Sequence, residues 1–194
     1  MKLRRFAQHA VAGVLVLVSF LSSPVLAQSD HSHAEAAQAR ADQKASALVN
    51  MVREATERFH DVAVAEEEEY VLQFGCVSGS DYGAMGMHFV NMALVMDGEL
   101  DVTRPEIILY EPQPNGSLKL TGADYLVLAE AWDAKHESPP ELMGQLLHLF
   151  EAPNRFRLPA FYTLHVWAWK HSPTGPFVNW HAHVSCDAFS GSNP

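Results

Sequence analysis

Histidine is the residue type in this chain with the clearest capacity for chemistry. The 194-residue sequence contains eleven histidines, and two of them, His181 and His183, are separated by one residue. In a β-strand over residues 178–186 both imidazoles would project from the same face, where they could share one metal ion. His165 lies in a second predicted strand, over residues 160–170. If these strands pair as a hairpin, the three histidines could form a site with an open coordination position, which suits Zn²⁺ or another first-row metal.

His88 is a further candidate because glycines precede it. The segment 83–91 contains Gly83 and Gly86, and glycine permits close backbone approach to a ligand or to another strand. His88 could be a fourth ligand or a general base, and the alternative is a buried, hydrogen-bonded histidine in a β-bulge. The competing explanation for the whole set is that His-x-His arises by chance and that the histidine in strand 160–170 belongs to the core. The predicted ligands for a divalent transition metal (Zn²⁺, Cu²⁺ or Mn²⁺) are His88, His165, His181 and His183.

The two cysteines, Cys76 and Cys186, predict a disulfide. Strand alternation places each of them on the apolar face of its predicted strand, 70–77 or 178–186. Disulfides persist in oxidising compartments, and this bridge would join residues 110 positions apart. The chain-entropy model gives roughly 4–5 kcal/mol for such a closure, as an upper figure. A reactive or metal-binding pair is the weaker alternative, because neither cysteine belongs to a Cys-x-x-Cys motif.

The elements that must position these residues follow from apolar periodicity. Over residues 44–63, Leu48, Val52, Ala55 and Phe59 recur at steps of three and four, which predicts a helix with one apolar stripe. After Tyr70, short β-like runs are separated by Gly, Pro and Asn. We therefore expect an α+β fold, with one long N-terminal amphipathic helix packed on a mainly antiparallel β-sheet or partly closed barrel. The predicted strands are 70–77, 85–92, 105–110, 117–120, 124–130, 142–150, 160–170 and 178–186, of which 142–150 could equally be a short helix.

The N-terminus resembles a secretory signal peptide over residues 1–27. It has a basic start, an apolar run over 11–21 and the small-residue pattern Val-Leu-Ala at 25–27. Removing 27 of 194 residues leaves 167, and the loss of three Lys/Arg and no acid changes the net charge from −10 to −13. Residues 28–43 are then a predicted flexible tail and 44–194 a single domain, located in the periplasm or outside the cell. The acidity disfavours nucleic acid as a partner, and no second apolar run is long enough to span a bilayer.

Three segments resemble a group of uncharacterised exported bacterial proteins. They are Met-Gly-Met-His-Phe-Val-Asn at 85–91, Leu-Tyr-Glu-Pro at 109–112 and Leu-His-Val-Trp at 164–167. The resemblance covers most of residues 70–186 and implies export and the extent of the domain, with no assigned activity. It includes His88 and His165. It departs after Trp180, where the group has Asn-Pro and this chain has His-Ala-His, and this departure shifts weight towards His88 with His165 as the shared site.

Three classes of function remain open. The first is an exported module that binds a metal ion or small ligand through the histidine cluster. The second is a metal-dependent enzyme of the hydrolase type, in which the same histidines hold the ion and a carboxylate such as Glu111 acts as base. The third is a structural or oligomer-forming envelope protein. The binding module leads because the sequence has no nucleophile elbow, P-loop, dinucleotide fingerprint or His-Glu-x-x-His motif.

Overall fold

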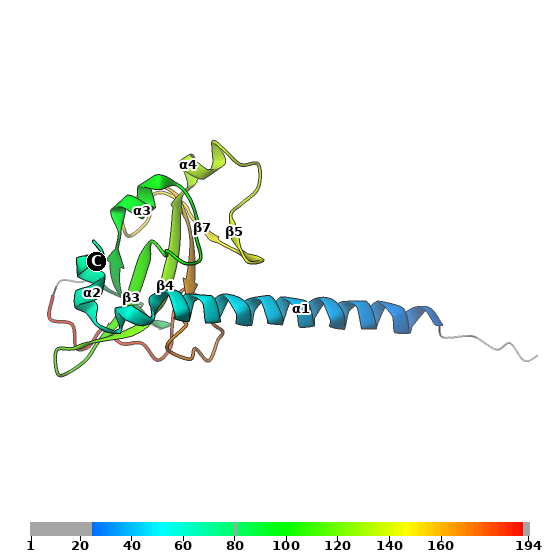
Figure 1. Ribbon diagram of the computed structural model, residues 1–194, viewed down its shortest axis with the longest axis horizontal. Coiled ribbons are helices and arrows are strands. Elements are labelled where there is room, and N and C mark those ends of the chain that lie inside the picture. Colours follow the sequence, from blue (N-terminus) through cyan, green and yellow to red (C-terminus); the bar gives the residue numbers. More distant parts are fainter. Residues whose placement is uncertain (1–24, 80, 192–194) are drawn as a thin grey trace, which may run out of the picture. The chain divides into compact units, whose positions relative to one another are not determined.

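The computed structural model describes residues 25–79 and 81–191 (Figure 1). The predicted signal peptide lies almost wholly outside these residues and stays a prediction. Within the described part of the chain, no helix combines the length and the apolar character needed to cross a membrane. The chain divides into two units after Ala37, and the sheet belongs to the second unit, from Gln38 onwards.

The predicted helix is present, but its bounds differ from those expected. Helix α1 covers Val25–Thr56, so the segment 28–43, predicted as a tail, falls within it. A 3₁₀ turn, η1 (Glu57–His60), and a short helix, α2 (Val62–Glu67), follow. At the end of α1 the Thr56 hydroxyl donates to Val52 O and accepts from Trp169 Nε1, which ties this end of the helix to the segment after β8 (Phe161–Val166). Asp61 then begins α2 by accepting a hydrogen bond from Ala63 N.

A curled, antiparallel six-stranded sheet forms the body of the unit, which confirms the α+β class. Its strand order is β1-β2-β3-β4-β8-β7, and β5 and β6 form a separate two-stranded sheet. Two short helices, α3 and α4, follow β2 and β4. The bounds are β1 Val71–Gly79, β2 Gly83–Val90, α3 Met92–Asp97, β3 Ile107–Pro112, β4 Leu118–Leu128, α4 Ala129–Asp133, β5 Glu141–Leu142, β6 Gln145–Leu146, β7 His148–Phe150 and β8 Phe161–Val166.

Most predicted strands exist, but the last one is wrong. The predicted strands 117–120 and 124–130 merge into β4, and the segment 142–150 divides among β5, β6 and β7. Residues 178–186 form no strand, and their one ladder contact is an isolated bridge between Ala84 and His181. The predicted hairpin with residues 160–170 is therefore absent. On β8, β4 pairs with Phe161–Val166 along one edge and β7 pairs with Phe161–Thr163 along the other, while His181 in the segment 178–186 bridges to Ala84 of β2 instead.

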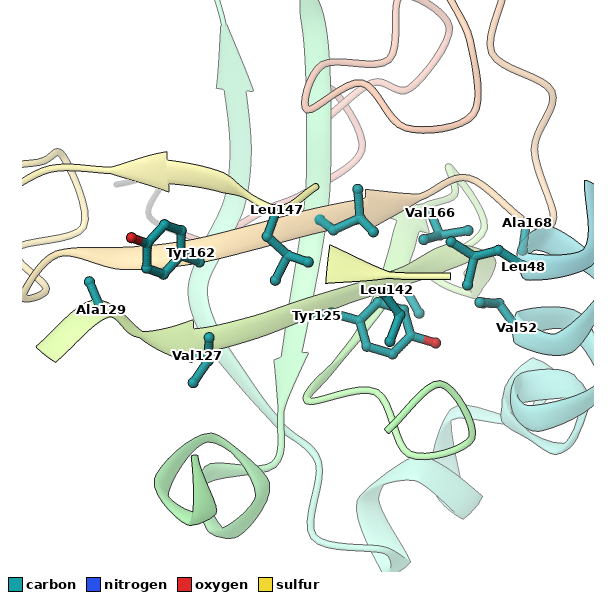
Figure 2. Packing of buried hydrophobic residues seen from close by; sticks show 12 residues of the cluster. Leu48, Val52, Tyr125, Val127, Ala129, Leu142, Leu147, Tyr162, Val166 and Ala168 are labelled. Atoms are coloured by element: carbon teal, nitrogen blue, oxygen red, sulfur yellow. The ribbon is translucent and has the colours of Figure 1, made fainter. Parts of the chain in front are cut away.

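The sheet is buried on both faces. Leu48 and Val52 of α1 pack beside Val166 and Ala168 near the end of β8, as Figure 2 shows, and this cluster continues along β4 and β8. Because side chains alternate along a strand, the residues between these positions project from the opposite face, where the candidate site lies. The cluster on the α1 face comprises Leu48, Val52, Ala123, Tyr125, Val127, Ala129, Leu142, Leu147, Tyr162, Leu164, Val166 and Ala168.

The predicted disulfide is confirmed, although by a different route from the one expected. Cys76 and Cys186 are bonded across 110 residues. The reasoning from alternation does not hold, because Cys186 lies in a loop and because β1 has a register shift between Gln73 and Cys76. The bond connects the first strand of the sheet to the C-terminal loop.

Candidate metal centre

Three buried side chains converge on the face of the sheet opposite α1. They are His88 from β2, Asp124 from β4 and His165 from β8, and one potential ligand atom of each lies within 4.8 Å of the others. Their exposed fractions are 5%, 2% and 2%. A pair of imidazoles and a carboxylate at such separations can hold a divalent transition metal.

Register and curvature explain how residues so far apart in sequence meet. Asp124 and His165 are direct cross-strand partners in the β4–β8 ladder, so their side chains stand together on one face. His88 belongs to β2, three strands from β8 in the sheet order. In a flat sheet that separation would be about 14 Å, yet the ring centroids of His88 and His165 are 5.7 Å apart. The curl of the sheet therefore brings His88 next to His165.

Hydrogen bonds orient two of the three groups and leave the third without a partner. His88 Nδ1 lies 3.2 Å from Gly86 O and donates to it when protonated, which leaves Nε2 as the free ligand atom. The Thr163 hydroxyl donates to Asp124 Oδ1 and fixes that carboxylate. His165 Nδ1 is 3.5 Å from Asp124 Oδ1, but neither ring nitrogen of His165 makes a hydrogen bond with any residue that the structure describes. Buried polar atoms are almost always satisfied, so an unpartnered imidazole points to a missing ligand.

Burial sets the protonation states of the site. Burial, with a smaller contribution from the neighbouring His165, lowers the pKa of His88 to about 4. Burial lowers the pKa of His165 to about 3, and His148 adds to the effect. The nearby Asn179 side chain opposes it, although its contact with the ring does not meet hydrogen-bond geometry. Burial also raises the pKa of Asp124 to about 6, against the influence of His88 and Thr163. At neutral pH the two imidazoles are uncharged, so the buried carboxylate has no protonated histidine to balance it, and a cation would supply that balance.

The three groups form part of the wall of a small pocket of about 30 Å³. A cavity of about 10–15 Å³ is enough for one water molecule, so the free space is small. The remaining lining is apolar apart from one hydroxyl. Besides His88, Asp124 and His165, the lining residues are Phe74, Met85, Ile107, Leu126, Phe150, Phe156, Leu158, Phe161 and Thr163.

The structure unites two of the four predicted ligands and separates the other two from them. His88 and His165 belong to the group, whereas His181 and His183 lie outside it. His181 is fully buried against Trp167, with ring centroids 4.8 Å apart, and its Nδ1 accepts from His183 N. His183 is exposed. The hairpin that was expected to bring the His-x-His pair beside His165 does not form, and His181 bridges to Ala84 of β2 instead.

Asp124 is the site residue that sequence reasoning missed. Its sequence signal is an acid inside the otherwise apolar run that ends β4, Ala-Asp-Tyr-Leu-Val-Leu over 123–128. Glu111, the suggested base, is engaged elsewhere. Lys170 Nζ lies 2.6 and 2.8 Å from its two carboxylate oxygens, and Ser185 N donates to Oε1.

No protein-family model, curated protein or solved structure matches this chain.

Proposed function

We propose that this protein is an exported metal-binding module in which His88, Asp124 and His165 hold one divalent first-row transition metal ion. The observation that carries the proposal is the buried Asp124 carboxylate beside two uncharged imidazoles, one of them with both nitrogens unpartnered. Zn²⁺, Cu²⁺ and Mn²⁺ are candidates. Fe²⁺ joins them because two histidines and one carboxylate are a recurrent ligand set for that ion.

Export is supported by two separate features. The leader-like residues 1–27 predict secretion, and the Cys76–Cys186 disulfide is of the kind that persists in an oxidising compartment. Mass spectrometry of the mature protein should find an N-terminus at Gln28. An intact Met1 on protein recovered from the cytoplasm would contradict export.

Metal binding is tested by elemental analysis of protein purified without a histidine tag. Wild-type protein should contain, or take up, one equivalent of metal, and its melting temperature should rise on loading. A free ion concentration of 100 Kd stabilises the folded state by about 2.7 kcal/mol. Asp124→Asn and His165→Gln should lose the equivalent. His183→Ala, which changes an exposed histidine outside the group, should keep it.

Circular dichroism of each variant distinguishes loss of ligand from loss of fold. The proposal fails if folded wild-type protein binds none of the four ions, or if His183→Ala removes the metal while Asp124→Asn retains it.

A metal-dependent enzyme of the hydrolase type is the second candidate. The observation that favours it is the ligand count, since three protein ligands leave coordination positions unfilled, as in catalytic rather than structural zinc sites. Glu111 is not available as its base because Lys170 and Ser185 occupy its carboxylate. Hydrolysis of carbonyl sulfide, a substrate of three heavy atoms, by the Zn²⁺-loaded protein, absent from Asp124→Asn, would support this candidate.

A further inference from the structure

The pocket beside the candidate metal centre has two kinds of wall. Polar groups lie on one side, where the three ligands and Thr163 gather, and apolar side chains form the rest. Among the described residues that line the pocket, none is Lys or Arg. A phosphate, a nucleotide or a multiply charged acid would therefore find no cationic partner apart from the metal itself. A sugar would leave its hydroxyl groups against apolar walls without hydrogen bonds.

The apolar wall consists of a buried part and a rim. Met85, Ile107, Leu126 and Phe161 are buried. The rim residues Phe74, Phe150, Phe156 and Leu158 are half-buried, so they lie between the pocket and solvent.

Phe74 is held at the rim by an unusual backbone conformation. Its φ is +63°, in the left-handed region, and Gly75 follows with φ +64°. The pair lies at the register shift of β1 between Gln73 and Cys76. A bulge of this kind redirects a side chain, and bulges occur often beside functional sites. A bulky residue with positive φ is a strained arrangement that the surrounding structure has to maintain.

Aromatic contacts then fix the rim across the opening. The ring of Phe74 meets that of Phe156 at a centroid distance of 5.4 Å, and Phe156 meets Phe161 at 6.3 Å. Phe150 stacks on Phe161 at 5.2 Å with an interplanar angle of 6°. The rings therefore hold one another in place by packing. The free volume of the pocket that they line is about 30 Å³.

We propose that the open face of the metal centre takes a ligand of only two or three heavy atoms, without polar groups beyond the atoms that bind the metal, and that Phe156 and Phe74 set this size limit. The inference rests on the metal site proposed above. A volume of about 30 Å³ corresponds to about two or three water-sized positions. Small molecules of the size of dioxygen or azide belong to this class, and aromatic acids do not.

The test uses the Co²⁺-loaded full-length protein, whose visible absorption reports on the ligands of the ion. Sodium azide, sodium acetate and sodium benzoate are titrated as probes of equal charge and increasing size. Wild-type protein should bind azide and should bind benzoate at least about thirtyfold more weakly. Phe156→Ala should tighten benzoate at least about tenfold and change azide by less than about threefold. Leu158→Ala enlarges the same rim and serves as a second variant if Phe156→Ala does not fold.

Tyr82→Ala is the matched control, because Tyr82 is 66% exposed and does not line the pocket. It should leave the azide-to-benzoate ratio unchanged. Two outcomes overturn the size limit and leave the metal site standing. One is that the Co²⁺-loaded protein binds azide and benzoate with equal affinity. The other is that neither Phe156→Ala nor Leu158→Ala changes the ratio of azide affinity to benzoate affinity. Failure of folded wild-type protein to bind Co²⁺, Zn²⁺, Cu²⁺, Mn²⁺ or Fe²⁺ overturns both the metal site and this inference.

Discussion

The three side chains of the candidate metal centre differ in the pH at which each takes up a proton. The imidazoles of His88 and His165 have pKa values lowered by burial to about 4 and about 3, whereas burial raises the pKa of Asp124 to about 6. All three respond to the same cause, loss of hydration, which disfavours the charged form of either kind of group. At neutral pH the site therefore contains one carboxylate and two uncharged imidazoles, which is the protonation state that binds a cation.

Metal affinity should decrease with acidity in two stages. Protonation of Asp124 competes with the ion first, so the affinity should fall about tenfold per pH unit below about pH 6. Protonation of the histidines should add to the slope only near pH 4 and below. Competition with a chromophoric chelator for Zn²⁺ over this range measures both stages. A two-proton slope that begins near pH 6.5 would show that the imidazoles have ordinary pKa values and would contradict the buried site.

Glu106 is a second buried acid, outside the metal group. Its exposed fraction is 1%, Leu126 N donates to its Oε2, and burial raises its pKa to about 8. The fold thus favours the protonated acid, whereas the unfolded chain releases the proton above its ordinary pKa of 4.5. Stability from this group is consequently lost as pH rises from about 4.5 to about 8.

Glu106→Gln should remove that loss. The neutral amide keeps an oxygen that accepts from Leu126 N. The free energy of unfolding of the variant should therefore exceed that of wild type, and the difference should grow with pH. At about 1.4 kcal/mol per unit of pKa shift, it should reach a few kcal/mol near pH 8. Urea unfolding at about pH 5 and about pH 8 measures the difference. The control is Glu99→Gln, whose side chain is 69% exposed. Parallel pH profiles for Glu106→Gln and wild type would refute the assignment.

At the scale of elements, the site depends on how closely β4 and β8 approach. Asp124 and His165 face each other in this ladder, and Gly122 lies two residues before Asp124. A Cβ at Gly122 would lie 2.1 Å from Val166 O, a backbone atom that has no freedom to move aside. Glycine at this position therefore permits the contact that aligns the two ligands.

Gly122→Ala should separate the strands. We expect a loss of about 3 kcal/mol in the free energy of unfolding, at the upper end of overpacking effects, together with weaker metal binding. Urea unfolding and the chelator competition measure the two effects. Gly116→Ala is the control: a Cβ there meets nothing within 4 Å, but φ is +82°, so only about 1 kcal/mol should be lost. Equal losses in the two variants would show that backbone contact at Gly122 is not the cause.

At the scale of the whole molecule, the disulfide joins distant parts of the chain. Cys76 lies in β1 at one edge of the sheet, and Cys186 lies in the C-terminal loop, which also meets β2 through the Ala84–His181 bridge. Because the bond joins residues 110 positions apart, it removes much of the freedom of the unfolded chain.

The Cys76→Ala, Cys186→Ala double variant should lose about 2–5 kcal/mol of unfolding free energy. Urea unfolding without reductant measures the loss, and wild-type protein in excess reductant should match the variant. A difference below about 1 kcal/mol would mean that the unfolded chain is already compact enough to make the bond redundant.

The sequence alone was sufficient for features that depend on local pattern. Apolar residues at steps of three and four predicted a helix that contributes Leu48 and Val52 to the core. The predicted strand over 160–170 contains β8, in which His165 lies on the face opposite Leu164 and Val166. Two cysteines in a chain with a leader-like start predicted the disulfide. The helix and strand inferences succeed because the period of each element is fixed by its own backbone, whereas the disulfide followed from the number of cysteines and the expected compartment.

Only the tertiary structure decided which residues make the site. The pairing of β4 with β8 placed Asp124 beside His165, whereas the segment with His181 and His183 meets the sheet at Ala84 of β2 and lies outside the group. Strand order and sheet curl arise from contacts between residues far apart in the chain, and no periodicity within one segment encodes them. The sequence thus determined that this protein has an α+β fold with histidines positioned on a sheet, and the curled sheet decided that two of them share a buried carboxylate.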